Sequence, residues 1–250
     1  EYNFRPKQVL KNTQDYQEKA DFILVSTKVL PSISTTDLIK PALSKNTSIV
    51  LLQNGIHIEK EVATSFPNHH LISILAFVCV SRTGEGEIHH QDYGRLVIGD
   101  FPEGLSHKTS TLIALWNRSK VPCEATSTIQ MQRWKKLVWN AAFNPMSVLH
   151  QMNTKEILDN ADLKNIVENV MQEVCLLAKA DGCALPANIV SENIAATQKM
   201  KPYKTSMLLD FEAKRPMEIE AILGNALKFA EQKSIETPYL KDLYNSLLTY

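Results

Sequence analysis

The sequence has no excess of charge of either sign. Its 250 residues contain 27 Lys+Arg and 27 Asp+Glu, so the formal net charge is zero. A protein that binds nucleic acid mainly through the phosphates needs a basic excess, and none is available here. The longest apolar run, Leu71 to Val80, is interrupted by Ser73 and is far shorter than the roughly 20 residues that cross a bilayer. These absences argue against nucleic acid and membranes as partners.

Paired cysteines are also absent. Four cysteines are dispersed along the chain with no Cys-x-x-Cys pair and no histidine at metal-ligand spacing, namely Cys79, Cys123, Cys175 and Cys183. Neither a metal site nor a disulfide framework is therefore predicted, and free thiols in a reducing, cytoplasmic compartment are the simplest interpretation. The opening residues, Glu1 to Pro6, show no signal-peptide pattern.

The first half of the chain alternates short apolar runs with helical stretches. Such runs, bounded by polar residues, are typical of buried parallel strands. Strands are predicted at 21–28, 46–55 and 71–81, with helices at 32–44 and 57–66 between them. Two shorter strands, 87–90 and 94–99, are predicted around a turn. This order favours an α/β domain with antiparallel strands added at its edge.

No strand pattern follows residue 126. A helix at 105–120 leads to a short extended segment at 121–125, and the remaining helices are predicted at 129–149, 160–180, 187–197, 205–213 and 217–232, with a last one near Leu240. The sequence therefore predicts an α/β domain at 1–125 and an all-α domain at 126–250.

Within the predicted helix at 129–149, the stretch 134–145 is apolar on nearly every side except for a single polar line. Lys136, Asn140 and Asn144 are spaced i, i+4, i+8 and so lie above one another. This line is either a structural stripe satisfied by its neighbours or the wall of a cleft that offers donors to an oxygen-rich ligand. Pro145 should bend the helix just after Asn144, at a cost of about 3 kcal/mol if uncompensated.

Further polar residues stand where α/β proteins bind ligands. Lys28 is the last residue of the first predicted strand, and Asn54 lies at the end of the second. Ligands bind at the carboxyl ends of such strands. Ser206 and Glu218 flank the turn at 214–216 in the helical half. Each residue also has an ordinary interpretation: a solvated lysine, an Asn-Gly turn, or an acidic residue in a first helical turn.

Taken together, these residues resemble the ketopantoate reductase (2-dehydropantoate 2-reductase) family. The resemblance rests on a strand ending at Lys28, on Leu-Leu-Gln-Asn54-Gly, on Trp-x-Lys136-Leu-x-x-Asn140-x-x-x-Asn144-Pro, on Thr-Ser206-Met-Leu-x-Asp210, and on Glu218-Ile-Glu220 with Gly224. The stretch from Gly84 to Gly99 is similar to the family's hairpin. Order and spacing are kept over most of the chain, so five elements in register are more specific than any one of them.

On the substrate side, the resemblance implies that Lys136 is the general acid that protonates the ketone oxygen. Asn140 and Asn144 would orient the hydroxyl and carboxylate oxygens of the substrate. Ser206 would bind its carboxylate, and Asn153 would add a polar contact. The substrate would be a small 2-keto acid.

On the cofactor side, the resemblance implies NADP. Lys28 would lie near the nicotinamide or the phosphates, and Asn54 would lie between cofactor and substrate. Glu218 would hold either Lys136 or the cofactor ribose through a charge-assisted hydrogen bond. The implied reaction is the NADPH-dependent reduction of ketopantoate to (R)-pantoate, for pantothenate and coenzyme A synthesis.

One element of the family is not found. The family opens with a strand and a Gly-x-Gly-x-x-Gly turn that holds the pyrophosphate, and residues 1–250 contain no such motif. Against the family, roughly forty residues of an opening βαβ unit are lacking, which leaves a partial Rossmann-type N-terminal domain. Three alternatives follow: this reductase, a reductase of another 2-keto acid, or a non-catalytic relative that binds without reacting. The sequence does not specify an oligomeric state, and a homodimer is left open.

Overall fold

The computed structural model describes residues 5–250, and its sheet has five strands in the order β1-β2-β3-β4-β5. The strands are β1 (Phe22–Val25), β2 (Ser48–Leu51), β3 (Leu71–Gly84), β4 (Glu87–Asp100) and β5 (Cys123–Ala125). β1, β2 and β3 are parallel, β3 and β4 are antiparallel, and β5 is parallel to β4. All four residues of β2 are buried, as expected for a central parallel strand.

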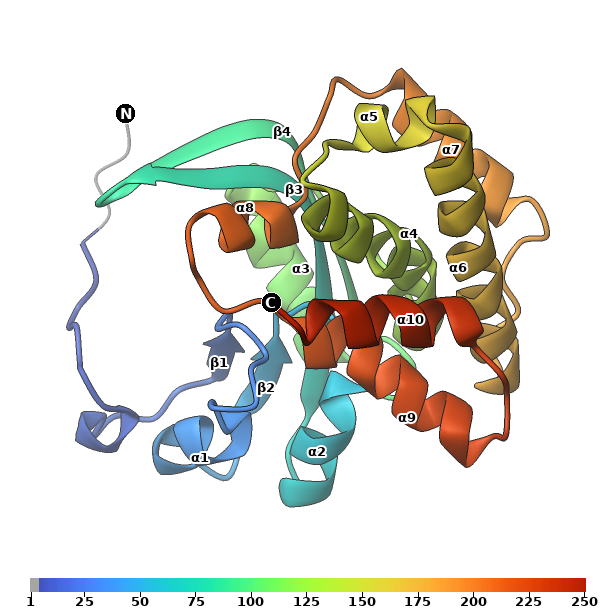
Figure 1. Cartoon of the computed structure of the whole chain (residues 1–250). Helices are drawn as coiled ribbons and strands as arrows, with labels where there is room; N and C mark the ends of the chain where they lie inside the picture. The colour runs from blue at the N-terminus through green and yellow to red at the C-terminus, as the bar shows by residue number, and fades with distance from the viewer. Residues whose placement is uncertain (1–4) are drawn as a thin grey trace.

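Short helices and turns connect the first strands and lie beside the sheet (Figure 1). They are the 3₁₀ turns η1 (Thr13–Asp15) and η2 (Lys40–Ala42), and the helices α1 (Thr35–Ile39) and α2 (Ile58–Ser65). Helix α3 (His107–Arg118) follows β4 and contributes Leu112 to a cluster with Ile72, Ile98 and other residues of the sheet. The predicted strands at 21–28, 46–55 and 71–81 and the predicted helices at 32–44, 57–66 and 105–120 are thus confirmed in type. All are shorter than predicted except β3, which is longer.

The predicted pair of short strands at 87–90 and 94–99 is wrong. Both stretches belong to one 14-residue strand, β4, which pairs along its length with the 14-residue β3. Tyr93 and Gly94 have φ of 61° and 122°, and the ladder shifts register between Cys79 and Val80 and between Phe77 and Val78. Because a bulge interrupts the alternation of side chains without ending the pairing, the sequence resembled a turn there. The long hairpin extends over α8 in Figure 1.

The second half of the chain is helical, and Figure 1 shows its helices gathered around α4. The helices are α4 (Ile129–His150), α5 (Thr154–Asp159), α6 (Ala161–Ala180), α7 (Ile189–Lys199), α8 (Ser206–Glu212), the π-helical η3 (Glu220–Gly224), α9 (Asn225–Gln232) and α10 (Pro238–Leu247). Helix α4 continues through Pro145, and Trp134, Leu137, Val138, Phe143 and Met146 are at most 2% exposed. An apolar helix of this kind becomes the centre of a helical core.

Helix α5 was not predicted. Its signal was nevertheless present, because Asn153 and Glu156 form a capping box: the Asn153 side chain accepts the N–H groups of Lys155 and Glu156, and the Glu156 carboxylate accepts the N–H of Asn153.

The fold class predicted from sequence, mixed α/β followed by an all-α region, is confirmed. The boundary between residues 125 and 126 stays a prediction. Within residues 5–250, no helix combines the length and the apolar character that crossing a membrane requires.

Candidate active site

Lys136 lies half-buried on α4, with its ammonium turned toward the sheet. Its Nζ donates to the Asn54 side-chain oxygen at 2.9 Å and to the Ala76 carbonyl at 2.7 Å. The ring of Phe77 lies 5.4 Å from the same Nζ. Two of the three ammonium donors are thus fixed by residues far away in sequence, which orients the group in the site.

Burial lowers the pKa of Lys136 to about 8, because the charged form loses water. The nearby Arg133 guanidinium contributes to this lowering, and the Glu218 carboxylate acts in the opposite direction. An ammonium with a pKa near the working pH both polarises a carbonyl and releases its proton readily, which is the requirement for a general acid.

Asn54 follows β2 in a loop of unusual backbone geometry. The next residue, Gly55, has a φ of 106°, and a Cβ built on it would lie 2.6 Å from the Ala221 carbonyl oxygen of η3. The N–H of Ile56 donates to that same oxygen at 3.0 Å. Only glycine permits this close approach, so the Asn-Gly pair holds the Asn54 carboxamide beside Lys136.

Glu218 lies just before η3 and faces the end of β1. Its carboxylate accepts the N–H of Val29 at 3.0 Å. Burial raises the pKa of Glu218, while the Val29 N–H, the Asn54 carboxamide and the Lys28 charge each lower it. Asn54 therefore lies between Glu218 and Lys136. Of the two partners predicted for Glu218, Lys136 is reached through this carboxamide, and the cofactor ribose stays a prediction.

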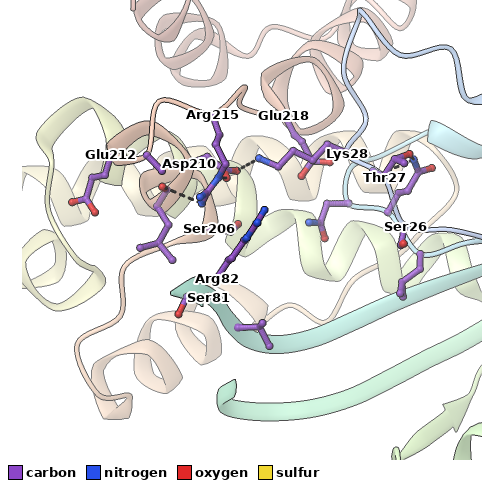
Figure 2. Close-up of a pocket in the computed structure, with 16 residues that line it drawn as sticks. Ser26, Thr27, Lys28, Ser81, Arg82, Ser206, Asp210, Glu212, Arg215 and Glu218 are labelled. Carbon is purple, nitrogen blue, oxygen red and sulfur yellow. Dashed lines mark hydrogen bonds and ion pairs between the residues drawn. The ribbon is translucent and has the colours of Figure 1, made fainter. Parts of the chain in front are cut away.

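Lys28 connects the end of β1 to the segment between α8 and η3. Its Nζ lies 2.5 Å from an Asp210 carboxylate oxygen and donates to the Pro216 carbonyl at 2.9 Å. Arg215 binds the other oxygen of Asp210 at 3.0 Å. Figure 2 shows Lys28 and Arg215 converging on Asp210 from opposite sides. Asp210 thus sets the position of Lys28.

Two adjoining cavities meet at Asn54 and Ser206. The first, of about 500 Å³, is lined by Lys28, Asn54, Ser206 and Glu218 together with Arg82 and Arg215 (Figure 2). The second, of about 780 Å³, is lined by Asn54, Lys136, Asn140, Asn144 and Ser206. Seven of the eight sequence-predicted site residues therefore line one or both cavities.

The polar line of α4 forms one wall of the larger cavity. Asn144 is 2% exposed and Asn140 is partly buried. Within residues 5–250 neither carboxamide makes a side-chain hydrogen bond to the protein, so both stay available for a ligand with oxygen atoms. Ser206, exposed at the first position of α8, adds a hydroxyl at the junction of the cavities.

Asn153 is the eighth predicted residue, and it lines neither cavity. Its side-chain oxygen instead accepts the N–H groups of Lys155 and Glu156 at 2.9 and 3.1 Å. Asn153 thus caps α5 in this structure, and its contact with the substrate stays a prediction.

Sequence reasoning missed the charged residues that support the site. Arg133 and Glu59 form a buried ion pair behind the Asn54 loop, and Asp210 holds Lys28. A usable signal existed for Arg133, since a charged residue on the buried face of an apolar helix requires a partner. Its partner Glu59 lies 74 positions earlier in the chain, and no local pattern connects the two.

The smaller cavity lies where open α/β sheets bind dinucleotides. Residues 26–28 and 52–54, which line it, directly follow β1 and β2 and so stand at the carboxyl ends of parallel strands. Its polar lining and the cations Lys28, Arg82 and Arg215 fit the nicotinamide–ribose end of such a cofactor. The glycine-rich turn that holds a pyrophosphate is not found in the sequence.

The polar ends of the parallel strands β1 and β2 face a helix that presents an ammonium and two carboxamides, an arrangement suited to polarising a carbonyl, as an α/β oxidoreductase does. The comparisons give the family. The model of "Ketopantoate reductase PanE/ApbA" matches residues 1–103, and that of "Ketopantoate reductase PanE/ApbA C terminal" matches residues 128–250. The chain belongs to the ketopantoate reductase family, as the sequence predicted.

Individual relatives agree with this assignment. The 2-dehydropantoate 2-reductase of Nostoc sp. is 33% identical over 234 residues, covering 92% of this chain and 73% of that protein. The crystal structure of 2-dehydropantoate 2-reductase from Methylococcus capsulatus is 44% identical, has a TM-score of 0.93, and covers 99% of this chain and 80% of its own. That from Geobacter metallireducens is 31% identical with a TM-score of 0.89, covering 96% and 80%.

Proposed function

We propose that this protein reduces 2-dehydropantoate to (R)-pantoate with NADPH, the step that supplies pantoate for pantothenate and coenzyme A. The observation that carries the proposal is the Lys136 ammonium, held by Asn54 and the Ala76 carbonyl on the wall of the larger cavity with its pKa at about 8. The similarity to 2-dehydropantoate 2-reductases of other organisms supports the choice of substrate.

Four residues that line the larger cavity have roles in this reaction, namely Lys136, Asn140, Asn144 and Ser206. When bound, the nicotinamide supplies the hydride that reduces the carbonyl carbon. Lys136 polarises the ketone oxygen and gives it a proton, so that no alkoxide has to form in the buried site. Asn140 and Asn144 bind the hydroxyl and carboxylate oxygens, and Ser206 donates to the carboxylate.

Residues of the smaller cavity would hold the cofactor. Lys28 and Glu218 bind its ribose and phosphate side, one as a cation and one as an acceptor of hydroxyl groups. Asn54 contacts both cavities, and its carboxamide keeps Lys136 directed at the ketone oxygen.

The direct test uses the protein produced from its whole reading frame. Purified protein should consume NADPH when 2-dehydropantoate is added, and chiral chromatography should find the R enantiomer of pantoate. NADH in place of NADPH serves as the comparison for cofactor choice. Protein that binds neither nicotinamide cofactor in a calorimetric titration would instead support the non-catalytic alternative.

The pH dependence of kcat/KM should follow Lys136. Because the acid form is protonated, activity should be constant below the pKa and fall about tenfold per pH unit above about 8. Glu218→Gln should move this decline to lower pH, because the negative charge that raises the pKa of Lys136 is removed. A decline that keeps its midpoint in Glu218→Gln would contradict the assignment of the titrating group.

The larger cavity also favours a second candidate, a 2-oxo acid with a larger apolar side chain. Beyond the polar line, its wall contains Phe77, Trp139, Tyr203, Ile189 and Met200. Burial raises the pKa of Tyr203 and of Cys79 beside it, so these two groups stay neutral. Such a surface would accommodate an aryl or long branched group as readily as the compact side chain of 2-dehydropantoate.

A substrate series separates the two candidates. We expect kcat/KM to be highest for 2-dehydropantoate and lower for pyruvate, whose side chain leaves the apolar wall unfilled, by about 1–3 kcal/mol per missing methylene equivalent. A phenyl-substituted 2-oxo acid that surpasses 2-dehydropantoate in kcat/KM would establish the second candidate.

A further inference from the structure

A buried ion pair lies behind the active-site loop and has no part in the reaction as described. Arg133 and Glu59 are 1% and 2% exposed at their side chains, and the guanidinium is in direct contact with the carboxylate. Ser73 completes the cluster, because its hydroxyl donates to Glu59 at 2.8 Å and accepts from Arg133 at 2.8 and 3.0 Å. Burying two charges is costly, and such a pair is weak evidence for stability by itself.

The remaining donors of Arg133 are directed at the Asn54 loop. Its Nη1 donates to the Gln53 carbonyl at 2.9 Å and to the Gly55 carbonyl at 3.1 Å. These two carbonyls belong to the residues on either side of Asn54, so one planar group holds both ends of a three-residue segment. A guanidinium can bind Ser73 through Nε and Nη2 and both carbonyls through Nη1 at once, because its five donors lie in one rigid plane, which the single ammonium of a lysine does not provide.

The same guanidinium lies one helical turn before Lys136. Residues three apart on a helix are neighbours, so the charge on Arg133 faces the region from which the Lys136 ammonium emerges. Lys136 in turn donates to the Asn54 oxygen. Arg133 is therefore connected to Lys136 twice, through the loop that holds Asn54 and through space.

We propose that Arg133, held by Glu59, is a positioning residue for the reaction: it fixes the Gln53–Gly55 segment so that Asn54 orients Lys136, and its charge favours proton release from Lys136. This inference rests on the proposed role of Lys136 as the acid. Neither Arg133 nor Glu59 lines the cavities, so neither touches the substrate.

Several other ionisable groups surround Lys136 and have to be separated from Arg133 in a test. They are Glu218 before η3 and, on the walls of the same cavity, Cys79, Arg95, Lys135, Glu192 and Tyr203. Beside burial, the Arg133 charge lowers the pKa of Lys136 and the Glu218 charge raises it. Substitution of Arg133 should therefore raise this pKa, whereas Glu218→Gln should lower it.

The experiment compares two variants that separate geometry from charge. Arg133→Lys keeps the charge but loses the fork, so kcat should fall about 10- to 100-fold with little change in the pKa of Lys136. The double variant Arg133→Met with Glu59→Gln removes both charges together, which avoids an unpaired buried carboxylate. In the double variant, kcat should fall by a similar factor and the pKa of Lys136 should rise. Arg118→Met, on the exposed surface of α3, is the control.

The pKa of Lys136 is measured without catalysis, by competitive acetylation across pH followed by mass spectrometry of the Lys136 peptide. Thermal unfolding of each variant sets an assay temperature at which all are folded. If the folded double variant keeps both its kcat and its acetylation midpoint, Arg133 is only structural and the inference is overturned. Failure of the proposed function gives a different result. The wild-type protein would then not reduce 2-dehydropantoate, while the acetylation midpoint of Lys136 would still differ between the wild type and the double variant. If the double variant does not fold, Arg133→Lys decides through kcat: a wild-type value overturns the inference.

Discussion

Substitution of Lys136 by alanine should reduce kcat for 2-dehydropantoate by about 10²- to 10⁴-fold, which is the range that a positioned general acid contributes. The ammonium is bonded to the Asn54 side chain, and its replacement leaves the Asn54 oxygen and the Ala76 carbonyl without that partner. Binding of substrate should weaken much less than kcat, because Asn140, Asn144 and Ser206 remain. Steady-state rates of NADPH consumption measure both quantities.

A lysine outside the site gives the matched control. Lys155 forms an exposed pair with Asp159 on α5 at 2.5 Å, so Lys155→Ala removes a charge of the same kind without touching either cavity. It should keep wild-type kcat and KM. Retention of wild-type kcat by Lys136→Ala would reject Lys136 as the acid, and with it the central residue of the proposed mechanism.

Substitution of Gly55 by alanine should destabilise the protein by about 2–5 kcal/mol and lower kcat at least tenfold. A φ of 106° is unfavourable for alanine by about 1–2 kcal/mol, and the new Cβ would lie 2.6 Å from the Ala221 carbonyl oxygen. Because the obstacle is backbone, the loop has to move away from η3 and take Asn54 with it. Chemical denaturation and steady-state kinetics measure the two effects.

The substitution Gly86→Ala is the control that separates the cost of backbone strain from the cost of the contact with Ala221. It also has a positive φ, 75°, but a Cβ there would meet nothing within 4 Å, at the turn between β3 and β4. Gly86→Ala should therefore cost only the strain of about 1–2 kcal/mol and leave kcat unchanged. Equal losses of stability in the two variants would show that the contact with Ala221 has no energetic consequence.

Much of the architecture was predictable because its causes are local. The fully buried β2 and the apolar α4 are recognisable from runs of apolar residues, and the polar line of Lys136, Asn140 and Asn144 follows from helical spacing alone. The long hairpin was predicted less well, because bulges in β3 and β4 break the alternation on which strand prediction depends.

The resemblance implied a substrate contact for Asn153, which stays a prediction. The structure adds a local role, because the capping box that Asn153 forms with Glu156 starts α5. Both interpretations need an asparagine with a free carboxamide oxygen, and only the direction of the following backbone distinguishes them.

The sequence by itself determined the order of the elements, the polar face of α4 and the membership of a reductase family. Only the tertiary structure decided which residues act together. Lys136 donates a hydrogen bond to Asn54, which lies 82 positions away in the sequence. Lys28 and Pro216 are bonded across 188 positions, and Arg133 and Gln53 across 80. The physical reason is that local spacing fixes the direction of a side chain on its own element, whereas the partner it meets depends on how packing brings distant elements together.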